Sequence, residues 1–142
     1  MKVRYITIEE VEFAAHELAR KHMTWNEPIP DFGTRFPTVL ERCLAAPQQK
    51  FSRRHLYKGL IGRAAILFYL LIKNHPFQNG NKRIAVMTTL YFFYKNGKWL
   101  KVSNQSLYNF AKWIAASDAQ LKDSVMLAIE EYFKKSLVDS HQ

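Results

Sequence analysis

The sequence has little of three things: cysteine, acidic side chains and long apolar runs. A single cysteine, Cys43, excludes an internal disulfide and predicts a chain that works in the reducing cytoplasm. The longest apolar run, Ala64 to Ile72, is far shorter than the about 20 residues that a bilayer span requires. Glu9 and Glu10 follow the N-terminus before any apolar stretch develops, which argues against a signal peptide. No membrane partner is expected.

The shortage of acidic side chains leaves the chain strongly basic. Its 12 acidic residues face 21 basic ones, which gives a net charge of +9. Such an excess favours an anionic partner, and nucleic acid, a nucleotide and an acidic protein surface all stay open. The densest basic stretch is Lys50–Lys58, where the cations alternate with Phe51 and Tyr57. This stretch could guide a target protein or a nucleic acid, or form an ordinary solvated face.

Hydrophobic residues make up 48% of the chain, so we predict a packed globular core in a single domain over residues 1–142. Apolar residues recur at helical spacing, and the fold class is predicted to be all-α with about six helices. The third of these helices is apolar nearly all round and should lie at the centre. The expected helices cover residues 8–23, 38–46, 56–73, 80–96, 103–116 and a last one capped by residues 117–120.

Strand signals are few. The N-terminal stretch VRYITI, residues 3–8, has the composition of a strand. The segment Trp25–Phe36 contains prolines and a glycine and must be a loop, with a short hairpin as its only candidate for regular structure.

The stretch NHPFQNGNKRI, residues 74–84, crowds polar side chains between two apolar helices. The first turn of any helix carries unpaired backbone N–H groups and partial positive charge. Lys82 and Arg83 lie in that turn, where cations repel the helix dipole, so their placement favours an anion such as phosphate. His75, across the loop, could accept a proton from an attacking hydroxyl.

The chemistry of two other side chains in this loop also indicates possible roles. Phe77 would anchor the loop by burying its ring, and the Asn79 side-chain oxygen could contribute to a Mg²⁺ site, although a carboxylate would bind the metal better. On the residues alone, the stretch is equally well read as a capped turn between helices. In that case His75 stabilises the end of the preceding helix, and Asn79 with Gly80 forms an ordinary turn.

The spacing HPFQNGNKR resembles the signature of the Fic/Doc (Fido) superfamily, His-x-Phe-x-acidic-Gly/Ala-Asn-Gly/Lys-Arg. It departs from that signature only at Asn79, and the likeness extends over roughly residues 56–100. Lys82 stands where Fic AMP-transferases usually have glycine, which is similar to the Doc, or death-on-curing, branch. The resemblance therefore implies the all-α fold of that superfamily.

The resemblance also implies roles for the residues of the loop. His75 would be the general base, and Lys82 and Arg83 would bind and neutralise phosphates during transfer. The implied cofactors are ATP and Mg²⁺, with Asn79 at the position of the metal ligand. The residues implied to line the nucleotide site are Phe77, Gly80, Asn81, Lys82 and Arg83.

In the Doc branch the implied reaction is transfer of the γ-phosphate of ATP to a hydroxyl of a target protein, with a translation factor as a candidate target. Proteins of this kind are commonly toxins that a separate antitoxin inhibits in trans. Protein AMP-transfer is the alternative, as is a pseudoenzyme or binding module weakened by Asn79. Nucleic-acid binding through the net charge is a third hypothesis, and it predicts salt-sensitive retention that survives His75→Ala.

Many Fic proteins carry an inhibitory helix with the pattern Ser/Thr-x-x-x-Glu-Gly/Asn, whose glutamate pairs with the motif arginine. None of the glutamates here is followed by glycine or asparagine. We therefore expect Arg83 to be accessible to phosphate in the isolated chain. We also expect that a separate antitoxin inhibits the chain, through a segment that folds onto an apolar groove rimmed with basic residues.

Overall fold

The structure is a computed structural model that describes residues 2–22 and 29–140. Six helices and very short strands make up this part of the chain, so the all-α prediction is confirmed. The first helix is continuous but changes its winding, from α1 (Ile8–Phe13) through the π-helix η1 (Ala14–Ala19) to α2 (Arg20–His22). The other helices are α3 (Pro37–Ala45), α4 (Gly59–Lys73), α5 (Asn81–Lys95), α6 (Asn104–Ala116) and α7 (Lys122–Ser136), with 3₁₀ turns η2 (Phe32–Thr34), η3 (Ala46–Gln48) and η4 (Ala119–Leu121).

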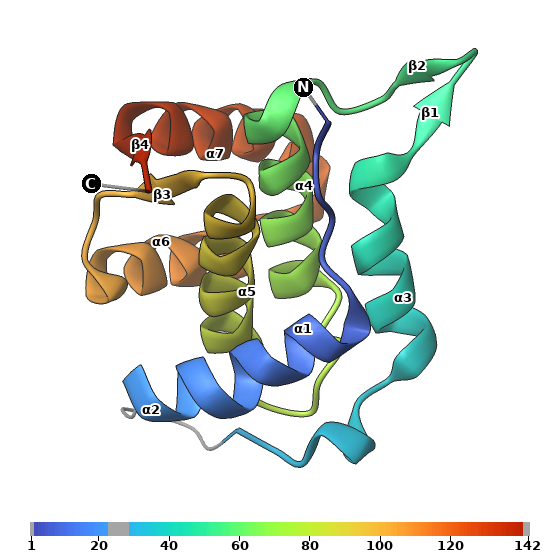
Figure 1. Cartoon of the computed structure of the whole chain (residues 1–142). Helices are drawn as coiled ribbons and strands as arrows, with labels where there is room; N and C mark the ends of the chain where they lie inside the picture. The colour runs from blue at the N-terminus through green and yellow to red at the C-terminus, as the bar shows by residue number, and fades with distance from the viewer. Residues whose placement is uncertain (1, 23–28, 141–142) are drawn as a thin grey trace.

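Helices α4 and α5 form an antiparallel pair at the centre of the molecule, as Figure 1 shows. The first helix packs across α5, and α3 packs on the flank of α4. Helices α6 and α7 cover the remaining side of the pair. Eleven residues of α4 are buried, which confirms that the helix predicted to be apolar all round occupies the centre. This arrangement fixes both ends of the α4–α5 pair, where the polar residues of interest lie.

The helix boundaries follow the capping signals of the sequence. Thr7 caps α1 through a complete capping box with Glu10, and Ser103 caps α6 by accepting a hydrogen bond from the Ser106 N–H. Gly97 follows the end of α5 with a positive φ of 78°, the left-handed conformation that glycine favours after a helix. Ahead of α7, Asp118 caps the 3₁₀ turn η4 by accepting a hydrogen bond from the Gln120 N–H, and α7 itself begins without a side-chain cap.

The strand predictions were wrong in both places where the structure describes them. Residues 3–7 are extended but pair with no strand, because the Asn96 side chain takes the place of a partner, bonding the Arg4 N–H at 2.8 Å and the Arg4 carbonyl at 2.9 Å. The described part of the proline-rich loop, residues 29–36, holds the turn η2 and no strand. Residues 25–28 of that loop and residue 23 of the predicted first helix lie outside the described residues.

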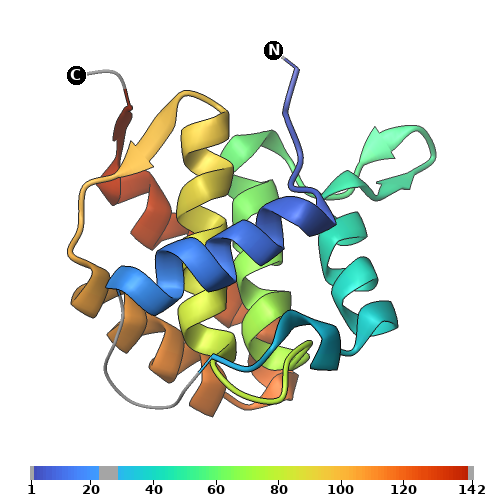
Figure 2. The same cartoon turned by 60° about the horizontal axis from the view of Figure 1, so that its bottom comes forward.

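Two short antiparallel ladders form elsewhere. Strand β3 (Lys98–Leu100) pairs with β4 (Leu137–Asp139), with Trp99 opposite Val138. Strand β1 (Lys50–Phe51) pairs with β2 (Arg54–His55), so the basic stretch contains a hairpin, and α4 begins at Gly59 and not at residue 56 as predicted. This hairpin projects from the body of the molecule at the end of α4 that is remote from the α4–α5 loop (Figures 1 and 2).

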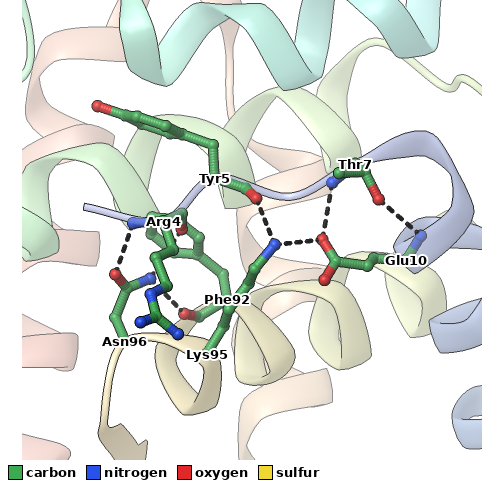
Figure 3. A network of polar contacts seen from close by, with 7 residues as sticks. All are labelled: Arg4, Tyr5, Thr7, Glu10, Phe92, Lys95 and Asn96. Atoms are coloured by element: carbon green, nitrogen blue, oxygen red, sulfur yellow. Dashed lines mark hydrogen bonds and ion pairs between the residues drawn. The ribbon is translucent and has the colours of Figure 1, made fainter. Parts of the chain in front are cut away.

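The end of α5 that leads into β3 holds a network of polar contacts, drawn in Figure 3. The Lys95 ammonium lies 2.6 Å from the Glu10 carboxylate and donates to the Tyr5 carbonyl at 2.7 Å. Asn96 adds the two hydrogen bonds to Arg4 described above. The network therefore fastens the N-terminal segment and the start of the first helix to the end of α5.

None of the described helices combines the length and the apolar composition needed to cross a membrane.

Candidate active site

The predicted site lies on the loop that joins α4 to α5. Asn74 ends α4 with its N–H bonded to the Leu70 carbonyl at 2.9 Å, and His75 follows with a positive φ of 50°. This left-handed conformation normally takes glycine after a helix and costs a side-chain-bearing residue roughly 1 kcal/mol. Pro76 then prevents the helix from continuing. A histidine in this strained position points to a functional rather than a structural requirement for the imidazole.

Asn81 clamps the loop from within. Its Oδ1 accepts from the Phe77 N–H at 2.9 Å, and its Nδ2 donates to the Phe77 carbonyl at 2.8 Å. Gly80, with a positive φ of 73°, turns the chain into α5 so that Asn81 can bond back to the backbone four residues earlier. Because both bonds are buried, they hold the backbone on either side of the Phe77 ring in one conformation.

The Phe77 ring is anchored by residues that the sequence analysis did not single out. It is 2% exposed and lies 5.8 Å from the Phe32 ring, which the Arg35 guanidinium covers at 4.2 Å. The Phe36 N–H donates to the Pro76 carbonyl at 2.9 Å. Figure 2 brings this side forward and shows residues 29–36 running beside the α4–α5 loop. Phe32 and Phe36, two aromatic residues inside a proline-rich loop, were the feature of the sequence that could have indicated this support.

The structure divides the predicted site residues into two groups. His75 and Asn79 are exposed and Lys82 is half-buried, so these three are open to a ligand. The buried residues are Phe77, Gly80, Asn81 and Arg83. Arg83, which the sequence led us to expect in an accessible position, is only 3% exposed. Lys82 is therefore the cation of the first turn of α5 that solvent reaches more readily.

The loop and the segments next to it in sequence carry basic but no acidic side chains. Helix α5 begins with no acidic residue in its first turn, and every charged side chain between Glu41 and Asp118 is basic. The backbone N–H groups in the first turn of a helix add partial positive charge. The arrangement suits a phosphate group better than it suits a free helix end.

A metal fits this site less well than a phosphate does. In the described ranges, 2–22 and 29–140, no group of three His, Cys, Asp or Glu side chains could hold a metal ion. Asn79 offers one neutral oxygen, and no carboxylate follows in sequence before Asp118. Mg²⁺ would therefore depend on oxygen ligands brought by another molecule, such as nucleotide phosphates and water.

Cys43 lies behind the loop and has a structural role. It is fully buried, and burial raises the pKa of its thiol to about 11, although a hydrogen bond with Asn74 partly opposes this rise. The thiol thus stays protonated and unreactive at neutral pH. It packs against the residue next to His75 and so supports the end of α4.

The fold and the loop define an all-α protein with a candidate phosphate site between its two central helices. The sequence model of the Fic/DOC family matches residues 5–93, which is more than half of the chain. The chain therefore belongs to the Fic/DOC family, whose members are typically nucleotidyl- or phosphotransferases. The match covers the first helix through α5 and leaves α6 and α7 outside it. No curated protein and no solved structure shows a significant match to the chain.

Proposed function

We propose that the chain is a Doc-like transferase that moves the γ-phosphate of ATP to a hydroxyl of a target protein, with a translation factor as the candidate target. The observation that supports it most is the exposed His75 beside the cationic first turn of α5. Membership of the Fic/DOC family makes phosphoryl or nucleotidyl transfer the expected class of reaction. The single, buried Cys43 agrees with action in the cytoplasm.

Each residue of the loop would contribute separately. His75 accepts the proton of the target hydroxyl as the hydroxyl oxygen bonds to the γ-phosphorus, while the bond from that phosphorus to the β–γ bridging oxygen breaks and ADP leaves. Lys82 and the N–H groups of the first turn neutralise the phosphate charge that grows during transfer, and Arg83 adds a second cation once the phosphate reaches it. Asn81 and Phe77 hold the loop so that these groups keep their positions.

Lys82 is the feature that favours γ-phosphate transfer over AMP transfer. A lysine side chain takes up space next to the helix start that a glycine would leave open, and Lys82 is half-buried there. A nucleotide whose α-phosphate cannot approach that space presents its terminal phosphate to His75 instead. Mg²⁺, bound mainly by the phosphates and water with Asn79 as a weak additional ligand, would neutralise the bound nucleotide.

Labelled ATP distinguishes the candidate reactions. The chain is incubated with ribosome-free translation extract and with ATP carrying label at the α- or the γ-phosphate. Label on protein from the γ-position alone supports the proposal, and label from the α-position alone means AMP transfer and refutes it. Absence of protein label from both positions, with ATP binding intact, favours the pseudoenzyme that Asn79 suggests. The control is His75→Ala, which removes the base.

We further propose that a separate antitoxin inhibits the chain, and that it binds a groove we call the Tyr94 groove. This groove has a volume of about 420 Å³ and is lined by Phe13, Leu18, His22, Met87, Leu90, Tyr91, Tyr94, Trp99 and Asn104. Tyr94 and Phe13 are 58% and 45% exposed, and both line this one groove, so they form part of a contiguous apolar surface. Tyr91 and Tyr94 also line an adjoining polar hollow with the exposed Lys2 and Arg4.

The charge of that rim determines the expected partner. An acidic amphipathic segment can place apolar side chains in the Tyr94 groove and carboxylates against Lys2 and Arg4. Expression in a bacterium tests this regulation: growth arrest that His75→Ala relieves, and that a small acidic partner suppresses, supports it. Tyr94→Ala should free the chain from such suppression while leaving arrest intact. Harmless overexpression of the folded chain would contradict the toxin proposal.

A further inference from the structure

A second cationic site lies at the other end of α4. Arg63, one turn into that helix, is 8% exposed, and its Nε is buried without a hydrogen-bond partner. None of the ion pairs formed among residues 2–22 and 29–140 involves Arg63. An arginine stays charged at any physiological pH, and a buried N–H without a hydrogen-bond partner destabilises a fold. A bound anion would accept a hydrogen bond from this N–H and balance the positive charge of the guanidinium.

The titratable side chain near Arg63, His55, does not neutralise the charge of the guanidinium. His55, at the end of β2, has a pKa below its ordinary value because partial burial, and then the nearby cations Arg63 and Lys50, disfavour protonation. The His55 Nδ1 is also buried without a hydrogen-bond partner in the described ranges. The backbone of Tyr57 packs against Gly62 and holds the end of the hairpin over the first turn of α4. Arg63 and His55, each with one buried nitrogen that lacks a hydrogen-bond partner, therefore lie near each other at the base of the hairpin.

The hairpin above this pair exposes an aromatic ring and several cations. Ser52 and Arg53 form its two-residue turn, with φ values of 52° and 67° that ordinarily favour Asn-Gly. Phe51 is 76% exposed, the most exposed large apolar side chain among the described residues. Exposed cations lie close to it in the sequence: Lys50, Arg53 and Arg54 on the hairpin and Lys58 at the start of α4.

We propose that the hairpin and Arg63 form a binding site for single-stranded nucleic acid, with one backbone phosphate held between Arg63 and His55 and an unpaired base stacked on Phe51. Phosphate satisfies the buried guanidinium with two parallel hydrogen bonds. An exposed aromatic ring between cations matches the stacking and charge that unpaired nucleotides require. A protein carboxylate could also pair with Arg63, but it would leave Phe51 without a planar partner.

This site is separate from the α4–α5 loop. The hairpin precedes the first turn of α4 and the loop follows its last turn. A helix of 15 residues spans about 22 Å, so one bound phosphate cannot occupy both sites. The proposed site goes beyond the transferase activity and does not depend on it, because His75→Ala leaves every residue of the hairpin in place.

Fluorescence anisotropy with a labelled 12-nucleotide oligouridine tests the proposal, with a duplex of equal length beside it. We expect tighter binding of the single strand and a salt slope of about −2, which corresponds to three neutralised phosphates. Phe51→Ala and Arg63→Met should each weaken binding about tenfold. The matched control is Lys134→Met, which removes one exposed positive charge from α7.

Arg63→Met also distinguishes a ligand site from a structural role. If Arg63 awaits a phosphate, the methionine should raise Tm while it weakens binding, because an apolar side chain replaces an uncompensated charge. If Arg63 supports the fold, Tm should fall, which overturns the proposal. The conservative Arg63→Lys should keep part of the affinity, which checks the proposal even if Arg63→Met folds poorly.

Three other results would also overturn it. The first is equal weakening by Lys134→Met, which would mean that only net charge matters. The second is an unchanged affinity of Phe51→Ala and Arg63→Met for oligouridine. The third is a shift of the His55 imidazole resonance by inorganic phosphate without any binding of oligouridine, which would leave only a site for a small anion.

Discussion

The two ends of α5 carry the same kind of charge in opposite electrostatic settings. At the C-terminal end, Lys95 lies where the helix dipole favours a cation, and it contacts Glu10 at 2.6 Å and the Tyr5 carbonyl at 2.7 Å. At the N-terminal end, Lys82 and Arg83 lie where the dipole opposes cations, with no acidic residue in the turn. The C-terminal end is thus arranged for stability and the N-terminal end for binding an anion.

The two ends also differ in backbone strain. The C-terminal end uses Gly97 for its left-handed residue, at no steric cost. The loop before the N-terminal end places His75 in the left-handed region, although glycine would be more stable there. The N-terminal end of α5 thus combines a strained residue, His75, with cations that the helix dipole opposes, and the C-terminal end has neither feature. This difference indicates that the N-terminal end is selected for chemistry.

His75→Gly should have the largest effect and should separate the two properties. Glycine removes the left-handed strain, so the free energy of unfolding should rise by up to about 1 kcal/mol. Transfer should fall at least about 100-fold because the base is gone. Urea unfolding and the labelled-ATP assay measure the two effects. Loss of stability together with activity would mean that the imidazole is part of the structure.

Asn81→Ala should weaken the loop itself. It removes two buried hydrogen bonds to the Phe77 backbone, so we expect a loss of about 2 kcal/mol in the free energy of unfolding and a parallel loss of transfer. Gln78→Ala is the matched control, because Gln78 lies exposed on the same loop. If the two variants are equally stable, the clamp does not hold the loop.

Asn79→Asp should improve the site. A carboxylate there supplies the charged oxygen that Mg²⁺ prefers, so we expect roughly tenfold higher Mg²⁺ affinity in the presence of ATP, which corresponds to about 1.4 kcal/mol. Isothermal titration with Mg²⁺ at fixed ATP measures it, and the transfer rate should rise as well. An unchanged affinity and rate would show that the metal is held without this side chain.

The smallest expected effect concerns pH at the other end of α5. Burial raises the pKa of Glu10, but the hydrogen bonds from Lys95 and Thr7 and the charge of Lys95 outweigh burial, so the pKa lies below its ordinary value. The ionised carboxylate therefore stabilises the fold above the unfolded-state pKa of about 4.5, and this contribution disappears as the pH falls through the lower folded-state pKa. Glu10→Gln should flatten that part of the stability–pH curve. An identical acid limb in both proteins would contradict the assignment.

The sequence predicted the helices and the polar loop because both depend on local signals. Apolar spacing placed the helices, and Thr7, Ser103 and Gly97 marked their ends. The loop was found because it resembles a known signature and because its two cations stand at the wrong end of a helix. The structure agrees with the predicted helices and with the place of the loop in the residues that it describes, but α4 starts later than predicted and Arg83 is buried where an accessible side chain was expected.

The sequence could not predict features that depend on contacts between distant segments. Asn96 takes the place of a strand beside Arg4, so a stretch with strand composition pairs with a side chain. The hairpin in the basic stretch needs left-handed Ser52 and Arg53, which turn statistics do not favour. The burial of Arg83 and of Arg63 likewise follows from packing, because neither position differs from an exposed arginine in a helical pattern.

The comparison of the two ends is tested most directly by reversing one charge at each and measuring Tm with and without ATP. In the absence of ATP, Lys82→Glu should raise Tm, with a gain of about 1 kcal/mol in the free energy of unfolding. It should also abolish the stabilisation of about 2.7 kcal/mol that ATP at 100 times its Kd gives the wild type. Lys95→Glu should lower Tm, because a carboxylate then faces Glu10, and should keep the ATP-induced shift. A Lys82→Glu protein that is less stable than the wild type, or that ATP still stabilises fully, would contradict the account.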